Sequence, residues 1–226
     1  YIYMYDITDE ELIANTFYIT YAFLMTTATI TLIEALKTKN PKIRNILNLE
    51  TCISVVAAFY YGKFVEELKE GIDYEKINVT RYVDWSITTP IMLLVLVLAL
   101  LYNNKKGAMS FRSYLIILLL NYAMLGFGFV GEIGLLDKTT ANSFGFGAFF
   151  AMYYYIYDRY IQGKNNFDNN MLFGAFVVLW GLYGVFYTMD TVTRNVGYNI
   201  LDLFSKCFVG IFFWAYFTGC LLYTSD

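Results

Sequence analysis

Lys206 lies in the middle of a long apolar segment, and Asp202 precedes it by four residues. This spacing places both side chains on one face of a helix, about one turn apart. An ionisable residue at bilayer depth is costly and usually marks a functional site with a nearby partner. Two roles fit a buried lysine: one half of a structural ion pair, or a desolvated amine that forms a Schiff base with a carbonyl cofactor. From this pair alone the structural role is favoured, because buried charges are usually just paired.

A second polar cluster begins at Arg81, with Asp84 three residues later on the same face. Thr88 lies one turn beyond, where we expect its hydroxyl to hydrogen-bond the carboxylate. Asp84 and Asp202 balance Arg81 and a cationic Lys206, and a low-dielectric interior tolerates such a neutral set. Two alternatives stay open: these residues lock two helices together, or they and nearby aromatic residues surround a flat apolar ligand. The aromatic candidates are Trp85, Trp180, Tyr183 and Tyr187.

Membrane-spanning helices must carry these residues. The chain has 226 residues, of which 58% are hydrophobic and 15% are charged. Its seven apolar runs, of about 20 residues or more, can each cross a hydrocarbon core roughly 30 Å thick. The sequence therefore predicts an all-α, multi-pass integral membrane protein, with a seven-helix bundle in one domain over residues 1–226. The runs are Glu11–Leu36, Ile43–Val65, Val79–Tyr102, Phe111–Leu136, Thr140–Ile161, Asn170–Met189 and Asn195–Tyr223.

Charged residues between the runs predict the orientation. Basic residues gather in the first, third and fifth loops, whereas the N-terminus and the second loop are acidic. Since basic loops favour the cytoplasmic side, we expect the N-terminus outside and the C-terminus in the cytoplasm.

Composition also excludes several kinds of chemistry. The chain has no histidine, and its cysteines lack metal-ligand spacing, so no metal site is predicted. The net charge of −3 and the lack of a Gly-rich phosphate loop do not indicate nucleic-acid or nucleotide binding.

Four segments together resemble the microbial (type I) rhodopsins. The resemblance covers the seven-helix length in the expected order, and the short loops, acidic outer face and missing histidine are similar to the giant-virus rhodopsin branch. The third-helix match is Arg81-Tyr82-x-Asp84-Trp85-x-x-Thr88-Thr89-Pro90, and the seventh-helix match is Leu201-Asp202-x-x-x-Lys206. The fourth and sixth helices match at Met124-x-Gly126-x-Gly128-x-x-Gly131 and Trp180-x-x-Tyr183-Gly184-x-x-Tyr187.

This resemblance implies that Lys206 binds all-trans retinal as a protonated Schiff base. Asp84 and Asp202 are then the expected counterions, with Asp84 the primary proton acceptor. Arg81 is expected on the outer side of Asp84, and Thr88 is expected to orient its carboxylate. The side chains implied to contact retinal are Trp85, Thr89, Met124, Gly128, Trp180, Tyr183 and Tyr187.

Two regions depart from the proton pumps of this family. Val95 stands where such pumps usually carry a carboxylic acid that reprotonates the Schiff base. Glu50 in the second run is the best other donor, because burial favours a protonated carboxyl, although a salt bridge near the membrane interface remains a structural alternative. On the outer side, Arg194 replaces a proton-releasing glutamate, and we expect it to pair with Asp190.

Three functions stay open on these residues. Passive light-gated cation conduction is narrowly favoured, by Val95, by Arg194 and by the polar second run around Glu50. An outward proton pump, with Asp84 as acceptor and Glu50 as donor, is the alternative, and sensory photoreception comes third. No enzymatic activity is expected, because the lysine reacts only with its cofactor. The expected partners are the lipid bilayer and transported H⁺ or small cations, with no nucleic acid, and the resemblance also implies that the chain can form a homo-oligomer.

Overall fold

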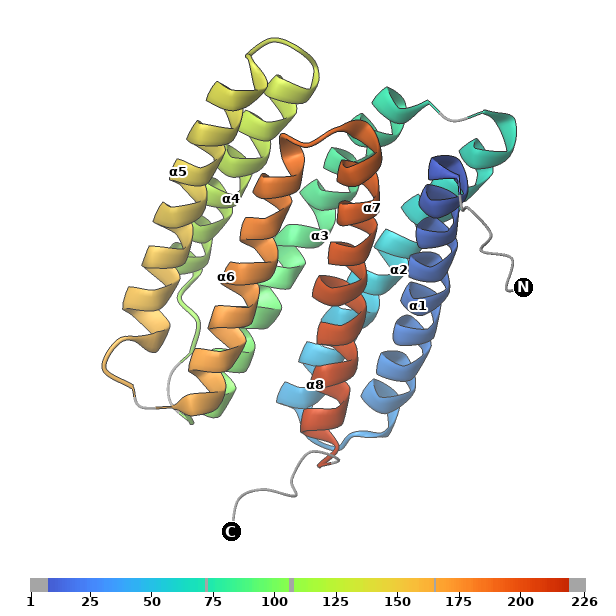
Figure 1. Cartoon of the computed structure of the whole chain (residues 1–226). Helices are drawn as coiled ribbons and strands as arrows, with labels where there is room; N and C mark the ends of the chain where they lie inside the picture. Colours follow the sequence, from blue (N-terminus) through green and yellow to red (C-terminus); the bar gives the residue numbers. More distant parts are fainter. Residues whose placement is uncertain (1–7, 72, 106–107, 165, 220–226) are drawn as a thin grey trace, which may run out of the picture.

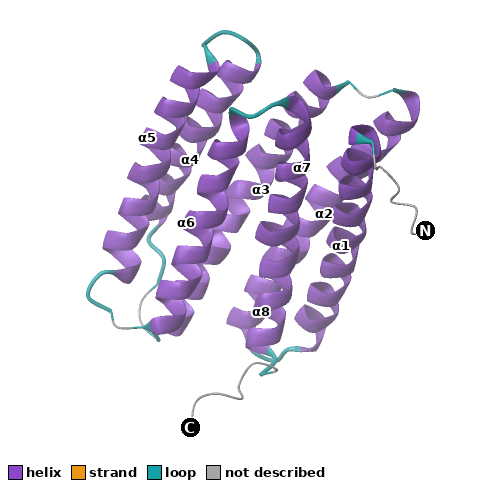
Figure 2. Ribbon diagram, viewed as in Figure 1, coloured by secondary structure: helices purple, strands orange, loops and turns teal. Residues whose placement is uncertain are grey.

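The computed structural model describes residues 8–71, 73–105, 108–164 and 166–219. Within this part the chain is helical and has no strand, and its seven helical segments lie side by side as a bundle (Figures 1 and 2). The predicted all-α bundle of seven helices is confirmed. The first four are α1 (Asp9–Lys37), α2 (Pro41–Glu70), α3 (Tyr74–Asn103) and α4 (Phe111–Glu132). The fifth is α5 (Lys138–Ile156) with η1 (Tyr157–Ile161), the sixth is α6 (Phe167–Tyr187), and the seventh runs through α7 (Thr191–Asp202), η2 (Leu203–Phe208) and α8 (Val209–Phe217).

Polar side chains fix where the helices begin. Thr8 forms a capping box with Glu11 at the start of α1. Asp137 and Asp190 accept hydrogen bonds from backbone N–H groups in the first turns of α5 and α7. Such caps satisfy donors that a helix start leaves free, so the polar loops set the helix ends close to the limits of the apolar runs.

Five of the seven segments are long and apolar enough to cross a membrane: α1, α3, α4, α6 and the continuous stretch Thr191–Phe217. The other two, α2 and α5, fall short, because α2 carries the polar residues Asn45, Asn48 and Glu50 between its charged ends and α5 is rich in small and hydroxyl-bearing residues. Both pack against the apolar helices, with α2 beside α1 and α3, and α5 beside α4.

Several predicted boundaries differ from the structure by four or five residues. Helix α2 runs past Val65 to Glu70, and α3 begins at Tyr74 and not at Val79. The fourth helix ends at Glu132 and not at Leu136, because Gly134 adopts a positive φ of 75° and the chain turns back on Val130. The seventh helix begins earlier, at Thr191, because Asp190 caps it. Its predicted end at Tyr223 lies outside the described residues.

The helix α3 carries buried side chains along most of its length. Near its start these are polar, including Arg81 and Asp84, and in its second half they are apolar, including Leu93, Val95 and Leu96. The bundle therefore has a charged layer near one end and a hydrocarbon layer beyond it.

Candidate functional site

Lys206 joins the seventh helix to α3 through buried ion pairs. Its Nζ lies 2.7 Å from Oδ2 of Asp84 and 3.2 Å from Oδ1 of Asp202. All three side chains are at most 2% exposed. The structure thus brings together the two clusters that are 122 residues apart in sequence. Lys206 itself lies in η2, a π-helical stretch, and such stretches often occur at functional sites.

Asp202 has more partners than Asp84. It accepts hydrogen bonds from the hydroxyls of Tyr61, at 2.8 Å, and Tyr183, at 2.6 Å. These tyrosines come from α2 and α6, so three segments of the bundle meet at this one carboxylate. By contrast, Oδ2 of Asp84 bonds only Lys206, and Oδ1 of Asp84 is buried without a hydrogen-bond partner among the described atoms.

Arg81 lies against the same group, on the side of Asp202. Its guanidinium is 3.8 Å from Oδ2 of Asp202 and donates to Oδ1 of Asn199 at 2.6 Å. It also donates to the Tyr61 hydroxyl at 3.4 Å. Neither Asn199 nor Tyr61 was predicted from the sequence. Asn199 could have been found, because it lies three residues before Asp202, whereas no local signal marks Tyr61.

The expected hydrogen bond between Thr88 and the Asp84 carboxylate is wrong. The Thr88 hydroxyl donates to the main-chain carbonyl of Asp84 at 2.9 Å. Thr89 does the same to Trp85, at 2.7 Å. Helical threonines commonly bond the carbonyl one turn back, and here this local bond prevails over the side-chain contact.

An apolar pocket extends from Lys206 between α3, α4, α5 and α6. Gly128 lets α4 lie close to Tyr82 of α3, since a Cβ at this position would be 2.6 Å from the Tyr82 hydroxyl. Every residue that the sequence predicted to contact retinal lines this pocket: Trp85, Thr89, Met124, Gly128, Trp180, Tyr183 and Tyr187. Other lining residues were not predicted from the sequence, among them Met92, Asn142, Phe146 and Tyr198. A pocket that is apolar along its length and ends at a lysine suits a long hydrocarbon with a terminal carbonyl.

Comparison with known proteins agrees with this geometry. A family described as bacteriorhodopsin-like protein matches residues 11–220. The chain belongs to this family. It is therefore an integral, multi-pass membrane protein, and its chromophore is retinal, bound through a Schiff base to Lys206.

Individual relatives of this rhodopsin show how far the likeness extends. The crystal structure of the viral rhodopsin OLPVRII is 57% identical, covers 93% of this chain and 99% of that chain, and has a TM-score of 0.88. This match supports the viral branch of the microbial rhodopsins. A thermophilic rhodopsin shares the fold, with 21% identity, 96% and 97% coverage of the two chains and a TM-score of 0.76. The blue-light absorbing proteorhodopsin of Gamma-proteobacterium Hot 75m4 is 28% identical over 156 residues, which span 61% of this chain and 60% of that protein.

The Lys206 amine stands in for the Schiff-base nitrogen of the retinal-bound rhodopsin. An ammonium nitrogen carries three hydrogens, whereas a protonated Schiff-base nitrogen carries one. The Schiff base can therefore donate a good hydrogen bond to only one carboxylate. The shorter distance, 2.7 Å, is to Asp84.

Glu50 is buried inside the bundle and is 2% exposed. Its Oε2 lies over the backbone of Gly210, where an added Cβ would be 3.1 Å away and would also lie 2.8 Å from Cγ2 of Thr27. Among the described residues Glu50 forms no ion pair, so the structure does not place it in an interfacial salt bridge.

Arg194 does not pair with Asp190. Its Nη1 lies 3.0 Å from Oε2 of Glu132, a residue that was not predicted from the sequence. Asp190 instead accepts from the backbone N–H of Thr193, at 3.0 Å, and caps α7. Capping is a local contact, and it leaves Arg194 free to reach across to the end of α4.

Proposed function

We propose that this rhodopsin moves protons when it absorbs light, with Asp84 as the acceptor and Glu50 as the donor. The observation that carries the proposal is the 2.7 Å contact between Nζ of Lys206 and Oδ2 of Asp84. Bound retinal supplies the absorption of light and a change of geometry at the lysine nitrogen. Asp84 is placed to take the proton from that nitrogen, because the two atoms are already within hydrogen-bond distance.

The burial of carboxyl groups supports Glu50 as the donor. Among the described residues, the fully buried carboxyl side chains are Glu50, Asp84 and Asp202. Asp84 and Asp202 already hold Lys206. Of these three carboxyls, Glu50 is therefore the one that does not hold Lys206, and it lies over Gly210, four residues after Lys206 on the seventh helix.

The packing of α3 favours the transport of protons over that of larger cations. The proposal therefore differs from the sequence-based prediction, which narrowly favoured a cation channel. Several side chains of α3 in the hydrophobic core are 0% exposed, among them Leu93, Val95, Leu96 and Val97. A hydrated cation needs a polar, water-filled path, whereas a proton passes between groups within hydrogen-bond reach. The hydrocarbon packing along α3 leaves no such water-filled path for a hydrated cation.

Light-gated cation conduction remains the second candidate because of a polar stripe between α1 and α2. The hydroxyls of Thr31 and Thr51 lie 2.8 Å apart across this interface. The hydroxyl of Ser54 is buried without a hydrogen-bond partner among the described atoms. Unpaired buried hydroxyls favour the entry of water, so this stripe is where a path would form if the helices separated.

Voltage-clamp recording on membranes containing the retinal-bound rhodopsin tests the proposal. We expect a light-induced current that persists at zero driving force and does not reverse at the equilibrium potential of any cation. Glu50→Gln should slow the recovery after each flash, and the exposed Glu75→Gln should not. A current that reverses at a cation's equilibrium potential would establish a channel, and no current would favour sensing. On the present proposal the protein is not an enzyme, because its lysine reacts only with its own cofactor.

A further inference from the structure

One end of the bundle contains a buried ion pair that the proposed proton transfer does not use. The loops from α4 to α5 and from α6 to α7 both lie at this end, the Glu132 end (Figure 1). Nη1 of Arg194 lies 3.0 Å from Oε2 of Glu132, and the two side chains are only 6% and 7% exposed. The pair joins the last residue of α4 to the first turn of α7. Since a buried ion pair is costly to break, it holds these two helix ends together.

The pair lies above the Lys206 site on the same helix face. Arg194, Tyr198, Asp202 and Lys206 follow at intervals of four residues, so successive side chains lie about one turn apart. Tyr198 lies between Arg194 and Asp202 on this face, and it is 4% exposed. Its ring centroid is 5.2 Å from that of Trp85, and both rings line the retinal pocket.

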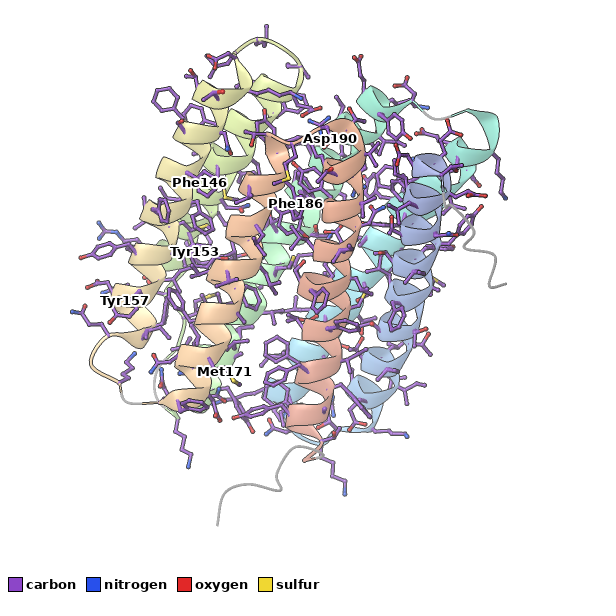
Figure 3. All side chains as sticks on the ribbon, in the orientation of Figure 1. Phe146, Tyr153, Tyr157, Met171, Phe186 and Asp190 are labelled. Atoms are coloured by element: carbon purple, nitrogen blue, oxygen red, sulfur yellow. The ribbon has the colours of Figure 1, made fainter. Side chains whose placement is uncertain are left out.

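Lys138 marks the side of the pair that faces the solvent. Its Nζ lies 3.7 Å from Oε2 of Glu132, but its side chain is 45% exposed. Figure 3 shows Asp190 in the loop that leads into α7, at the same end of the bundle. Glu132 and Arg194 therefore stand between solvent-exposed residues and the aromatic layer over Lys206.

We propose that the Glu132–Arg194 pair is a closure, which keeps water-soluble reagents away from the Lys206 nitrogen by tying the end of α4 to the start of α7. Only the binding of retinal to Lys206 is required, so the closure is independent of whether the rhodopsin pumps or conducts. Opening would separate the ends of α4 and α7 and expose Tyr198 and Trp85.

Hydroxylamine bleaching in the dark tests this closure. Hydroxylamine replaces the lysine nitrogen on retinal, giving retinal oxime and the free lysine amine, so the rate of loss of the visible band reports its access to the site. Glu132→Gln and Arg194→Gln should bleach about ten times faster than the unmodified rhodopsin, the factor expected from loss of a charge-assisted bond. Lys138→Gln is the matched control. It removes a charge from the same cluster but only an exposed contact, so its rate should stay within about twofold.

Arg194→Lys covers the case in which the neutral variants do not bind retinal. It keeps the positive charge but lacks the guanidinium that bonds Glu132, and it should also bleach faster. Unchanged rates in variants with a normal visible band would overturn the proposal, as would an equal acceleration in Lys138→Gln. Failure of all pair variants to bind retinal would show a role in assembly and not in access, and would overturn it too. Photocurrent plays no part in this readout, so the result is separable from the test of proton transfer.

Discussion

The two carboxylates beside Lys206 should differ in what they contribute to stability. Asp84→Asn and Asp202→Asn each remove one negative charge from a set of two cations and two carboxylates, so the charge imbalance they leave is the same. Their hydrogen bonds differ, because Asp202 also accepts from Tyr61 and Tyr183, at 2.8 and 2.6 Å. We therefore expect Asp202→Asn to destabilise the rhodopsin more than Asp84→Asn.

The size of the difference follows from the two tyrosine bonds. A hydrogen bond to a charged group contributes about 1.5–3 kcal/mol, and one between neutral groups about 0.5–1.5 kcal/mol. Converting two such bonds from charged to neutral should cost Asp202→Asn about 2 kcal/mol more than Asp84→Asn. In proteins of about 150–250 residues a loss of about 1 kcal/mol lowers Tm by about 2–4 °C, so the extra shift should be about 4–8 °C.

Thermal loss of the visible band, measured on both retinal-bound variants, gives this difference. Tyr61→Phe and Tyr183→Phe, made alone and combined with Asp202→Asn, complete double-mutant cycles, and each tyrosine should cost less when the carboxylate is already absent. An equal shift for the two aspartate variants would refute the reasoning. So would tyrosine effects that simply add to that of Asp202→Asn.

Two further predictions concern the pocket and the end of α7. Gly184→Ala should shift the absorption maximum and lower Tm, because its Cβ would lie 2.5 Å from Cζ of Phe146, a residue that lines the retinal pocket. Gly174→Ala is the control, and it should do neither, because the space around Gly174 is open. Equal absorption spectra for the two variants would contradict this prediction. Hydrogen bonds from the side chain and the backbone N–H of Thr193 hold the pKa of Asp190 below its usual value. The stability that this cap contributes should therefore be complete above the ordinary aspartate pKa and be lost as pH falls through the lowered pKa of Asp190. Melting curves at acid pH should show this loss for the unmodified rhodopsin but not for Asp190→Asn.

The sequence determined the local parts of this rhodopsin. Apolar runs predict helices because a segment that crosses a membrane must satisfy its own backbone. Helical periodicity then places Asp202 beside Lys206 and Arg81 beside Asp84, since residues three or four apart share a face. The family motifs predicted the residues of the retinal pocket, and every residue that they implied lines it.

The tertiary structure decided which distant partners these residues meet. Tyr61 reaches Asp202, and Glu132 reaches Arg194, across 141 and 62 residues. No local spacing indicates such contacts, because they depend on how whole helices pack. Local bonds also replaced two expected ones: Thr88 bonds the backbone of Asp84, and Asp190 caps α7. Spacing on a helix thus fixes which side chains share a face, and packing fixes what that face meets.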